Sequence, residues 1–261
     1  MTLGIVGTGA LTAAVITGLK SSGNDARRVL LSPRNAEISA ELAARYADVQ
    51  VASDNQAVLD GSETVMLAVR PQVAREVLQV LRFQNDHHVV SFIATISREE
   101  IASLVAPAER VTKALPMPMI AHKLGATIIF PPDPGIAAFF GKLGKAIEVE
   151  SEHEFNALSV VTATYATYFR YLDTIDDWLE SHDVSSDTAR EYIATLFKAL
   201  AHAPEAAPAS AFMDLAKEYA TIGGINEQVL SELESQDVFK MFAKSLDNVY
   251  RRVSGPWNVD V

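Results

Sequence analysis

Cysteine is absent from the 261 residues of this chain. Its absence excludes disulfide bonds, thiolate metal sites and cysteine nucleophiles, and it favours a cytoplasmic protein. No apolar run reaches the roughly 18 residues that a membrane-spanning helix needs. The apolar run at residues 3–6 has no basic region before it. We therefore expect this run to belong to the fold rather than to a signal peptide.

Basic residues are scarce: 22 Lys and Arg stand against 33 Asp and Glu, which gives a formal net charge of -11. Because phosphate backbones attract basic surfaces, this balance argues against nucleic acid as a partner. The content of 49% hydrophobic and 21% charged residues is ordinary for a soluble globular protein. An anionic cofactor would depend on helix dipoles and on a few placed cations.

The N-terminal segment has the pattern of a strand, a tight turn and a helix. Leu3 to Val6 is a short apolar run, Gly7-Thr8-Gly9 interrupts it, and helical periodicity begins near Ala10. The first glycine allows the turn, and the second lets the backbone approach a pyrophosphate at the helix N-terminus. Thr12 occupies the place of the third glycine of this fingerprint. The pattern predicts a dinucleotide site.

A second predicted strand, residues 28–32, ends where a Rossmann unit contacts the adenosine ribose. An NAD site usually has Asp or Glu at this point, whereas this chain has Ser32-Pro33-Arg34-Asn35. A hydroxyl and a guanidinium suit a 2′-phosphate, which favours NADP. The alternative is that Arg34 is a solvated residue at a helix start.

Strands and helices alternate up to residue 150, which is typical of a parallel, doubly wound sheet. A capping box is predicted at Ser97 and Glu100. Beyond the first two strands, we predict strands at residues 49–52, 64–69, 89–94, 110–115, 127–130 and 146–149.

From Ser151 onward the apolar spacing is that of helices throughout. Its aromatic residues are expected in a core or a subunit interface. Ala203–Pro208 is predicted to link two helices. The expected domains are a dinucleotide-binding α/β domain at residues 1–150 and an all-helical domain at 151–261. The predicted helices cover residues 154–180, 186–201, 209–220, 226–234 and 237–252.

Several stretches, taken in order, resemble pyrroline-5-carboxylate reductases, which reduce a cyclic imino acid to proline with NAD(P)H. Gly4 to Gly9 is similar to that family's Gly-Phe-Ile-Gly-x-Gly, and Ala68-Val69-Arg70-Pro71-Gln72 to its Ala-Val-Lys-Pro-Gln. Ile93 to Ile96 stands where the family has Ser-x-x-Ala-Gly-Ile. Pro116 to Thr127 aligns without a gap on its Pro-Asn-Thr-Pro-Ala segment, and Gly223 to Asn226 resembles its Gly-Gly-x-Thr.

The resemblance implies a Rossmann domain and a helical domain through which two subunits intertwine, with the active site at the dimer interface. The homodimer can assemble further. Helix 154–172 and the Gly223-Gly224 turn would form the substrate pocket. The cofactor would be NADP, held by Gly7, Thr8, Gly9, Ala10 and Leu11 at the pyrophosphate, by Ser32, Arg34 and Asn35 at the ribose phosphate, and by Ala68, Val69 and Pro71 at the cofactor edge.

The departures from the family pattern concern the substrate half. The family's asparagine and threonine are Met117 and Pro118 here, its Ser-Gly-Ser-Gly-Pro is Ser159 to Ala163, and its last threonine is Asn226. The candidate catalytic residues that remain are Ser159, Thr162, Tyr165 and Asn226. For each of them, an ordinary role in a helix or a cap is the alternative.

Hydride transfer needs the nicotinamide to be placed near an electrophilic carbon and water to be excluded. A ketone would also need a proton donor, and there is no lysine between Lys145 and Lys198, so an imine is favoured. Tyr165 or His122 could still donate a proton. The pairs His153-Glu154 and Asp176-Asp177 lack the spacing of a metal site, and no metal is expected.

Three functions remain open at this point. The first is an NADPH-dependent reductase of a small cyclic imino acid, of the pyrroline-5-carboxylate reductase type found in proline biosynthesis. The second is an oxidoreductase of the same fold that acts on another imine or on a carbonyl compound. The third is a non-catalytic protein that binds NADP.

Overall fold

The computed structural model describes residues 2–21 and 25–255, and it divides into two compact units. Of the described residues, those up to residue 160 and those from residue 250 form the sheet unit, and residues 161–249 form the helical unit. The predicted domain boundary at residue 150 stays a prediction, because compact units need not coincide with domains that fold alone. Within the described residues, no helix is long and apolar enough to span a bilayer.

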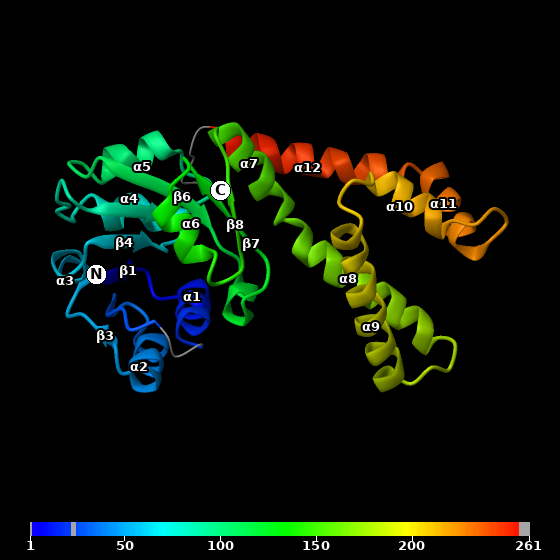
Figure 1. Cartoon of the computed structure of the whole chain (residues 1–261), viewed down its shortest axis with the longest axis horizontal. Helices are drawn as coiled ribbons and strands as arrows, with labels where there is room; N and C mark the ends of the chain where they lie inside the picture. Colours follow the sequence, from blue (N-terminus) through cyan, green and yellow to red (C-terminus); the bar gives the residue numbers. More distant parts are fainter. Residues whose placement is uncertain (1, 22–24, 256–261) are drawn as a thin grey trace. The chain divides into compact units, whose positions relative to one another are not determined.

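Eight strands form one sheet in the order β3-β2-β1-β4-β5-β6-β7-β8 (Figure 1). The first six strands are parallel, which confirms the predicted doubly wound sheet. The strand order reverses between β1 and β4, so the carboxyl ends of these two strands lie side by side at the switch point where such sheets bind ligands. The strands are β1 (Leu3–Val6), β2 (Val29–Leu31), β3 (Val49–Val51), β4 (Thr64–Leu67), β5 (His88–Ser91), β6 (Arg110–Leu115), β7 (Ala126–Phe130) and β8 (Lys145–Glu148).

The last two strands differ from the predicted all-parallel pattern. β7 runs antiparallel to β6, with Leu115 opposite Ile128, and β8 is parallel to β7. A parallel return needs a crossover of about a dozen residues or more. Here β6 and β7 are joined by a short segment that contains the 3-10 helix η1 (Pro118–His122). Apolar runs predict a buried strand but carry no information on its direction.

Helices cover both faces of the sheet (Figure 1). Along β4, Met66 packs in one core and Val65 and Leu67 in the other, as the alternation of strand side chains requires. The first core contains side chains of α1 (Ala10–Lys20), α2 (Ala36–Arg45), α6 (Pro134–Phe140) and η1. The second contains side chains of α3 (Asn55–Asp60), α4 (Pro71–Leu78) and α5 (Arg98–Leu104).

The C-terminal part of the chain is helical, as predicted, but two local predictions are wrong. The helix predicted at residues 154–180 is two helices that break at Thr162 and Ala163, after the β-branched run Val160-Val161-Thr162. The linker predicted at Ala203–Pro208 is helical up to Ala206, with Pro204 inside the last turn. The helices are α7 (Glu152–Val161), α8 (Thr164–Glu180), α9 (Ser186–Ala206), α10 (Phe212–Tyr219), α11 (Ile225–Ser235) and α12 (Val238–Ser254).

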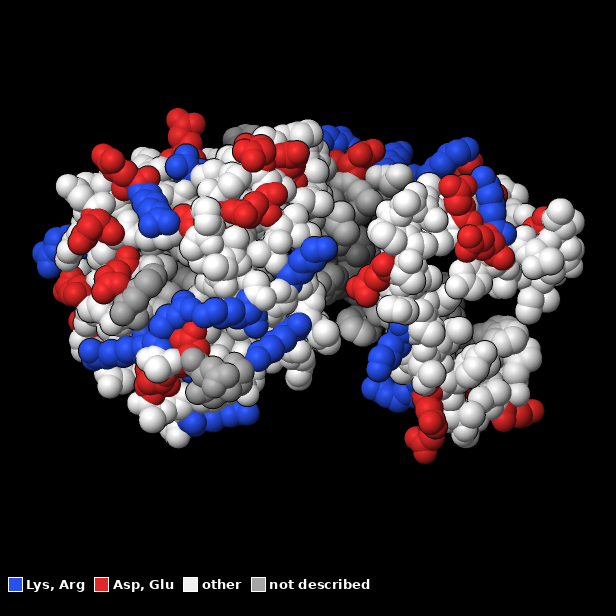
Figure 2. Space-filling view, in the orientation of Figure 1, with Lys and Arg blue, Asp and Glu red and all other residues white. Residues whose placement is uncertain are grey.

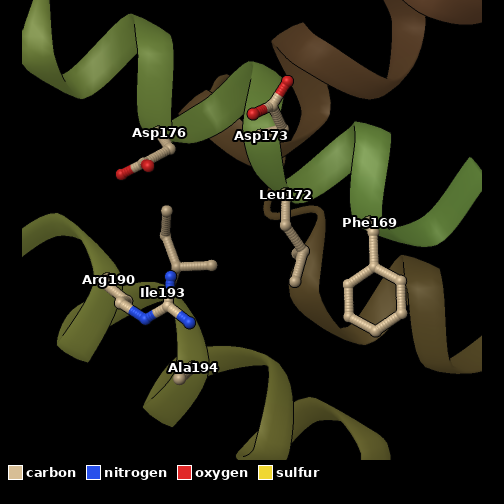
Figure 3. Close-up of a pocket in the computed structure, with 7 residues that line it drawn as sticks. All are labelled: Phe169, Leu172, Asp173, Asp176, Arg190, Ile193 and Ala194. Carbon is tan, nitrogen blue, oxygen red and sulfur yellow. The ribbon is translucent and has the colours of Figure 1, made fainter. Parts of the chain in front are cut away.

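Acidic and basic side chains are interspersed on the face that Figure 2 shows. In the helical unit, α8 and α9 pack through edge-to-face ring pairs that Phe197 makes with Tyr168 and Tyr171. Beside these rings the two helices enclose a cavity of about 350 Å³ (Figure 3).

Candidate cofactor site

The loop between β1 and α1 has the geometry of a phosphate-binding turn. Gly7 has φ +103, and a Cβ at this position would lie 2.5 Å from the carbonyl oxygen of Ala68, so only glycine fits. Gly9 has extended backbone as the N-cap of α1, and a Cβ there would meet nothing within 4 Å. The space in front of Gly9 is therefore open toward the N–H groups of the first turn of α1.

Hydrogen bonds from three buried hydroxyl groups hold this loop in place. Ser32 Oγ accepts a hydrogen bond from Gly7 N at 2.9 Å, and Thr8 Oγ1 donates to Ser32 O at 2.7 Å. Thr12, which replaces the third glycine, is fully buried and donates through Oγ1 to Gly7 O at 2.6 Å. The loop is thus held by hydrogen bonds to α1 and to the segment after β2, without a ligand.

A cavity of about 420 Å³ lies in front of the loop, at the carboxyl ends of β1 and β4. The exposed guanidinium groups of Arg34 and Arg70 belong to its lining, on segments that follow β2 and β4. Asn35 caps α2 by accepting from Ile38 N at 3.4 Å. The lining residues are Gly7, Thr8, Gly9, Arg34, Asn35, Ala36, Ala68, Val69, Arg70 and Val73.

Seven of the predicted cofactor residues belong to this lining, namely Gly7, Thr8, Gly9, Arg34, Asn35, Ala68 and Val69. Ser32 is buried beneath the loop, and Ala10, Leu11 and Pro71 lie at the starts of α1 and α4 beside it. Their contacts to a cofactor stay predictions. The prediction omitted Ala36, Arg70 and Val73, although Arg70 stands between two residues that it included.

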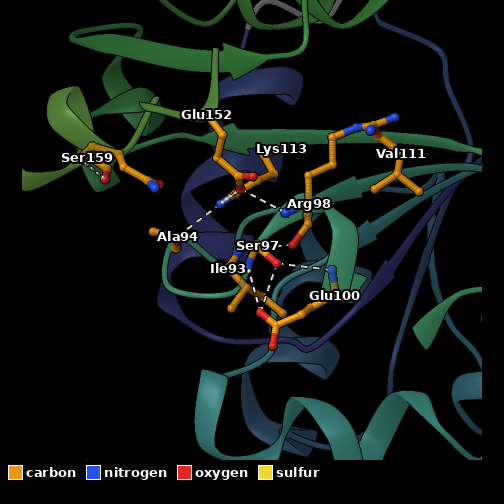
Figure 4. A network of polar contacts seen from close by, with 11 residues as sticks. Ile93, Ala94, Ser97, Arg98, Glu100, Val111, Lys113, Glu152 and Ser159 are labelled. Carbon is orange, nitrogen blue, oxygen red and sulfur yellow. Dashed lines mark hydrogen bonds and ion pairs between the residues drawn. The ribbon is translucent and has the colours of Figure 1, made fainter. Parts of the chain in front are cut away.

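A second polar network lies beyond the end of β5 (Figure 4). Lys113 Nζ, on β6, donates to Glu152 Oε1 at 2.8 Å and to Ala94 O at 3.2 Å. The same carboxylate oxygen accepts from Arg98 N at 2.8 Å. The predicted capping box of Ser97 and Glu100 forms at the start of α5. The network joins the segment after β5 to β6 and to the first turn of α7.

Lys113 is one of the most buried charged groups among the described residues, with a side chain that is 1% exposed. Burial lowers the pKa of Lys113 below its usual range, and the hydrogen bond and charge of Glu152 oppose this shift. The ammonium group also lies 4.6 Å from the ring centroid of Phe155. Lys113 and Glu152 belong to the lining of a cavity of about 310 Å³ within the sheet unit.

The candidate catalytic residues lie on separate elements. Ser159 is buried in the sheet unit, and its hydroxyl donates to Asn156 O at 2.8 Å. Thr162 is in the turn before α8, where its carbonyl accepts from Tyr165 N at 3.3 Å, and the Tyr165 side chain is exposed. Asn226, in the first turn of α11, donates through Nδ2 to Tyr219 O at 3.1 Å. Their catalytic roles stay predictions.

The residues of the cavity fit a dinucleotide phosphate. Open backbone at Gly9, a helix N-terminus and two guanidinium groups supply hydrogen-bond donors and positive potential for an anion. No cluster of three or more His, Asp or Glu side chains suited to a metal ion occurs within residues 2–21 and 25–255.

Comparison with protein families assigns each part of the chain separately. Residues 2–95 match the family model described as NADP oxidoreductase, coenzyme F420-dependent. Residues 152–255 match the model described as pyrroline-5-carboxylate reductase dimerisation. The first match contains the loop of Gly7 to Gly9 and both guanidinium groups of the cavity.

Individual proteins match along nearly the whole chain. A pyrroline-5-carboxylate reductase of Haemophilus influenzae is 23% identical over 244 residues, covering 90% of this chain and 89% of the relative. The crystal structure of the reductase from Streptococcus pyogenes has a TM-score of 0.85 at 20% identity and covers 97% of this chain and 98% of the other. The Plasmodium falciparum reductase with NADP bound has a TM-score of 0.82 at 14% identity, covering 97% of each chain.

Proposed function

This chain belongs to the pyrroline-5-carboxylate reductase family, and we propose that it reduces the C=N bond of a small cyclic imino acid with hydride from NADPH. Members of this family are NAD(P)-dependent oxidoreductases that act on a CH–NH bond. We further propose that it works in the cytoplasm as a homodimer that pairs through its helical unit.

The cavity in front of Gly7 to Gly9 carries the proposal. Its open backbone and the N-terminus of α1 would hold the diphosphate of the cofactor. Arg34 and Asn35 line this cavity and would stand at the ribose, and its described lining residues include no carboxylate that could accept a 2′-hydroxyl. Arg34 would bind the 2′-phosphate, and the preference for NADPH over NADH follows from that contact.

Bound NADPH supplies the hydride, and the chain itself has to position the cofactor and the substrate. An iminium substrate already carries its proton, so no general acid is required at the reacting carbon. We assign substrate contacts to Ser159, Thr162, Tyr165 and Asn226. Met117 and Val160 stand where the family has polar or small residues, so a more apolar ring than that of pyrroline-5-carboxylate is also compatible with these positions.

The proposal is tested by following the loss of reduced-nicotinamide absorbance with pyrroline-5-carboxylate as substrate. Turnover with NADPH that exceeds turnover with NADH supports it. Measurable NADPH binding without turnover would exclude this substrate, and a panel of larger cyclic imines and of ketones then identifies the acceptor. No turnover with any C=N compound, despite NADPH binding, would refute a reductase function.

A further inference from the structure

The helical unit leaves most of its apolar side chains exposed. No residue of α8 or α11 is buried, and α9 buries only Ala189 and Ile193. Phe169 is 65% exposed, and Trp178 and Tyr192 are similarly open. Between scattered charges, most of the visible surface of this unit in Figure 2 is uncharged. A folded unit with so small a core needs a further apolar surface against it.

The cavity between α8 and α9 adds two opposite charges to this apolar surface. Figure 3 shows Asp176 on α8 and Arg190 on the facing part of α9, with Ile193 between them in this view and Leu172 to one side. The cavity of about 350 Å³ is lined by Phe169, Leu172, Asp173, Asp176, Arg190, Ile193 and Ala194.

The carboxylate of Asp176 is incompletely paired within its own chain. Its Oδ1 atom is buried and has no hydrogen-bond partner among the described residues. The neighbouring Asp173 and Asp177 differ, because both pair with Arg170, which lies 3.8 Å from Asp177 Oδ2. Because Oδ1 is covered by the chain itself, a cation from outside can approach the carboxylate only from the cavity, where its charge would offset the cost of the unpaired oxygen.

Arg190 carries a positive charge that is not paired with a carboxylate in the described part of its own chain. Its side chain is exposed, and no carboxylate of the described residues lies within 4.0 Å of its nitrogen atoms. Both unsatisfied charges therefore line one cavity, on a surface that already requires an apolar partner. In a dimer with twofold symmetry, a contact from one residue to a second is repeated in reverse across the axis.

We propose that Asp176 and Arg190 form the reciprocal charged contact of the homodimer. Arg190 of each subunit enters the cavity of the other and donates to Asp176 of the partner subunit, so the interface contains the pair twice. The occupant of the cavity is thus a second copy of this chain. This inference rests on the homodimer proposed above and on the match of residues 152–255 to a dimerisation family.

Two charge reversals in the full chain test the pair. In D176R or R190D alone, each homodimer would place like charges together at both contacts, and we expect the dimer to weaken at least about tenfold. A mixture of D176R chains with R190D chains behaves differently. In the mixed dimer, both contacts again join opposite charges, so we expect the heterodimer to recover most of the wild-type affinity.

The experiment with mixed chains also distinguishes a contact between subunits from a contact within one chain. If Asp176 paired with Arg190 of its own chain, mixing would leave both defects in place. The heterodimer is measured by light scattering after size exclusion, with two chains that carry different tags. Exposed residues of α9 provide matched controls, K198D for the charge change of R190D and E191R for that of D176R. Neither control should weaken the dimer.

Folding of each variant is checked by far-ultraviolet circular dichroism. Arg190 is exposed, so Arg190→Gln supplies a milder variant, whose dimer should be weaker and less sensitive to salt than that of the wild type. The proposed contact between Asp176 and Arg190 would be overturned if the single reversals dimerised like wild type. It would also be overturned if the mixture dimerised no more tightly than either variant alone. Neither result would contradict the homodimer itself. A monomeric wild-type chain would overturn the homodimer as well, whatever the reductase assay gives.

Discussion

Lys113 Nζ lies 2.8 Å from Glu152 Oε1, in an ion pair whose lysine side chain is 1% exposed and whose glutamate side chain is 28% exposed. The two residues are 39 positions apart in the sequence. Their contact fastens the first turn of α7 to β6, and Glu152 also accepts from Arg98 N at the start of α5. The entry to the C-terminal helices is therefore anchored on a buried charge in the sheet.

Substitution of Glu152 and substitution of Lys113 should lower the free energy of unfolding by different amounts. Glu152→Gln leaves an ammonium group buried without a counterion, and we expect a loss of about 3–5 kcal/mol in the free energy of unfolding. Lys113→Met removes the buried charge and leaves a carboxylate that water can reach, so the loss should be smaller. Urea unfolding measures both. Lys142→Met, at an exposed lysine 3.9 Å from Asp25, is the control and should change little.

The pH dependence of this site has a defined sign. Because burial lowers the pKa of Lys113 in the folded chain, the unfolded chain binds more protons between that lowered pKa and the ordinary lysine value of 10.5. The free energy of unfolding contributed by Lys113 therefore increases as the pH rises through that interval. Lys113→Met should remove this contribution. An unchanged slope between the two proteins would contradict a lowered pKa of Lys113 in the folded chain.

Cofactor preference should depend on Arg34. Arg34→Ala removes the guanidinium proposed for the 2′-phosphate, and a charge-assisted hydrogen bond is worth about 1.5–3 kcal/mol. We expect NADPH affinity to fall by about tenfold to a hundredfold, with little change for NADH, in calorimetric titrations. Arg45→Ala, at the other end of α2, controls for loss of a positive charge. Equal losses for both cofactors would refute the 2′-phosphate assignment.

Features that depend on neighbouring residues could be predicted from the sequence. The capping box of Ser97 and Glu100 and the bounds of β6 agree with their predictions, because caps and strand alternation are set within a few residues. The turn at Gly7 is likewise local, since its positive φ requires glycine.

Features that depend on distant residues were not predicted. The hydroxyl of Ser32 forms hydrogen bonds with Gly7 and Thr8, which are 25 and 24 positions away, and its contact with a cofactor stays a prediction. The ion pair of Lys113 joins elements that only the folded sheet brings together. The position of Arg70 in the cavity lining also depends on the fold, because the motif Ala68 to Gln72 does not indicate which of its side chains face the cavity.

Gly9 should be required for binding but not for folding. Its backbone is in a region open to alanine, and a Cβ would meet nothing within 4 Å, so Gly9→Ala should leave the free energy of unfolding nearly unchanged. The same methyl group would occupy the space that a pyrophosphate needs. We expect NADPH affinity to fall at least about tenfold. Retained affinity would show that the diphosphate does not approach this glycine.

Gly18, in contrast to Gly9, should be required for the stability of the fold. It lies on α1 where η1 packs, and a Cβ there would be 2.3 Å from Ile120 O, a backbone atom that cannot move aside alone. Alanine would gain about 1 kcal/mol in helix propensity, but the clash should cost more, about 1–3 kcal/mol. Gly18→Ala should therefore lower stability. Gly9→Ala, in the same segment, is the matched control in urea unfolding.

His88 should make the protein less stable in mild acid. Its Nε2 atom lies 3.1 Å from Thr112 Oγ1 and 3.4 Å from Asp133 Oδ2, within a cavity of about 630 Å³ whose lining also includes Glu63 and Asp86. Burial, together with the charge of Arg110, lowers the pKa of His88 despite the opposing charge of Asp133.

The unfolded chain therefore binds a proton at this histidine from about pH 6.5 downward, while the folded chain does not until its lowered pKa is reached. Over that interval, the free energy of unfolding should fall by up to about 1.4 kcal/mol per pH unit. His88→Gln keeps a polar group toward Thr112 and cannot take up a proton, so its stability should fall less steeply. His122→Gln, at an exposed histidine, controls for loss of an imidazole. Equal slopes for His88→Gln and wild type would show that His88 binds protons equally well in both states.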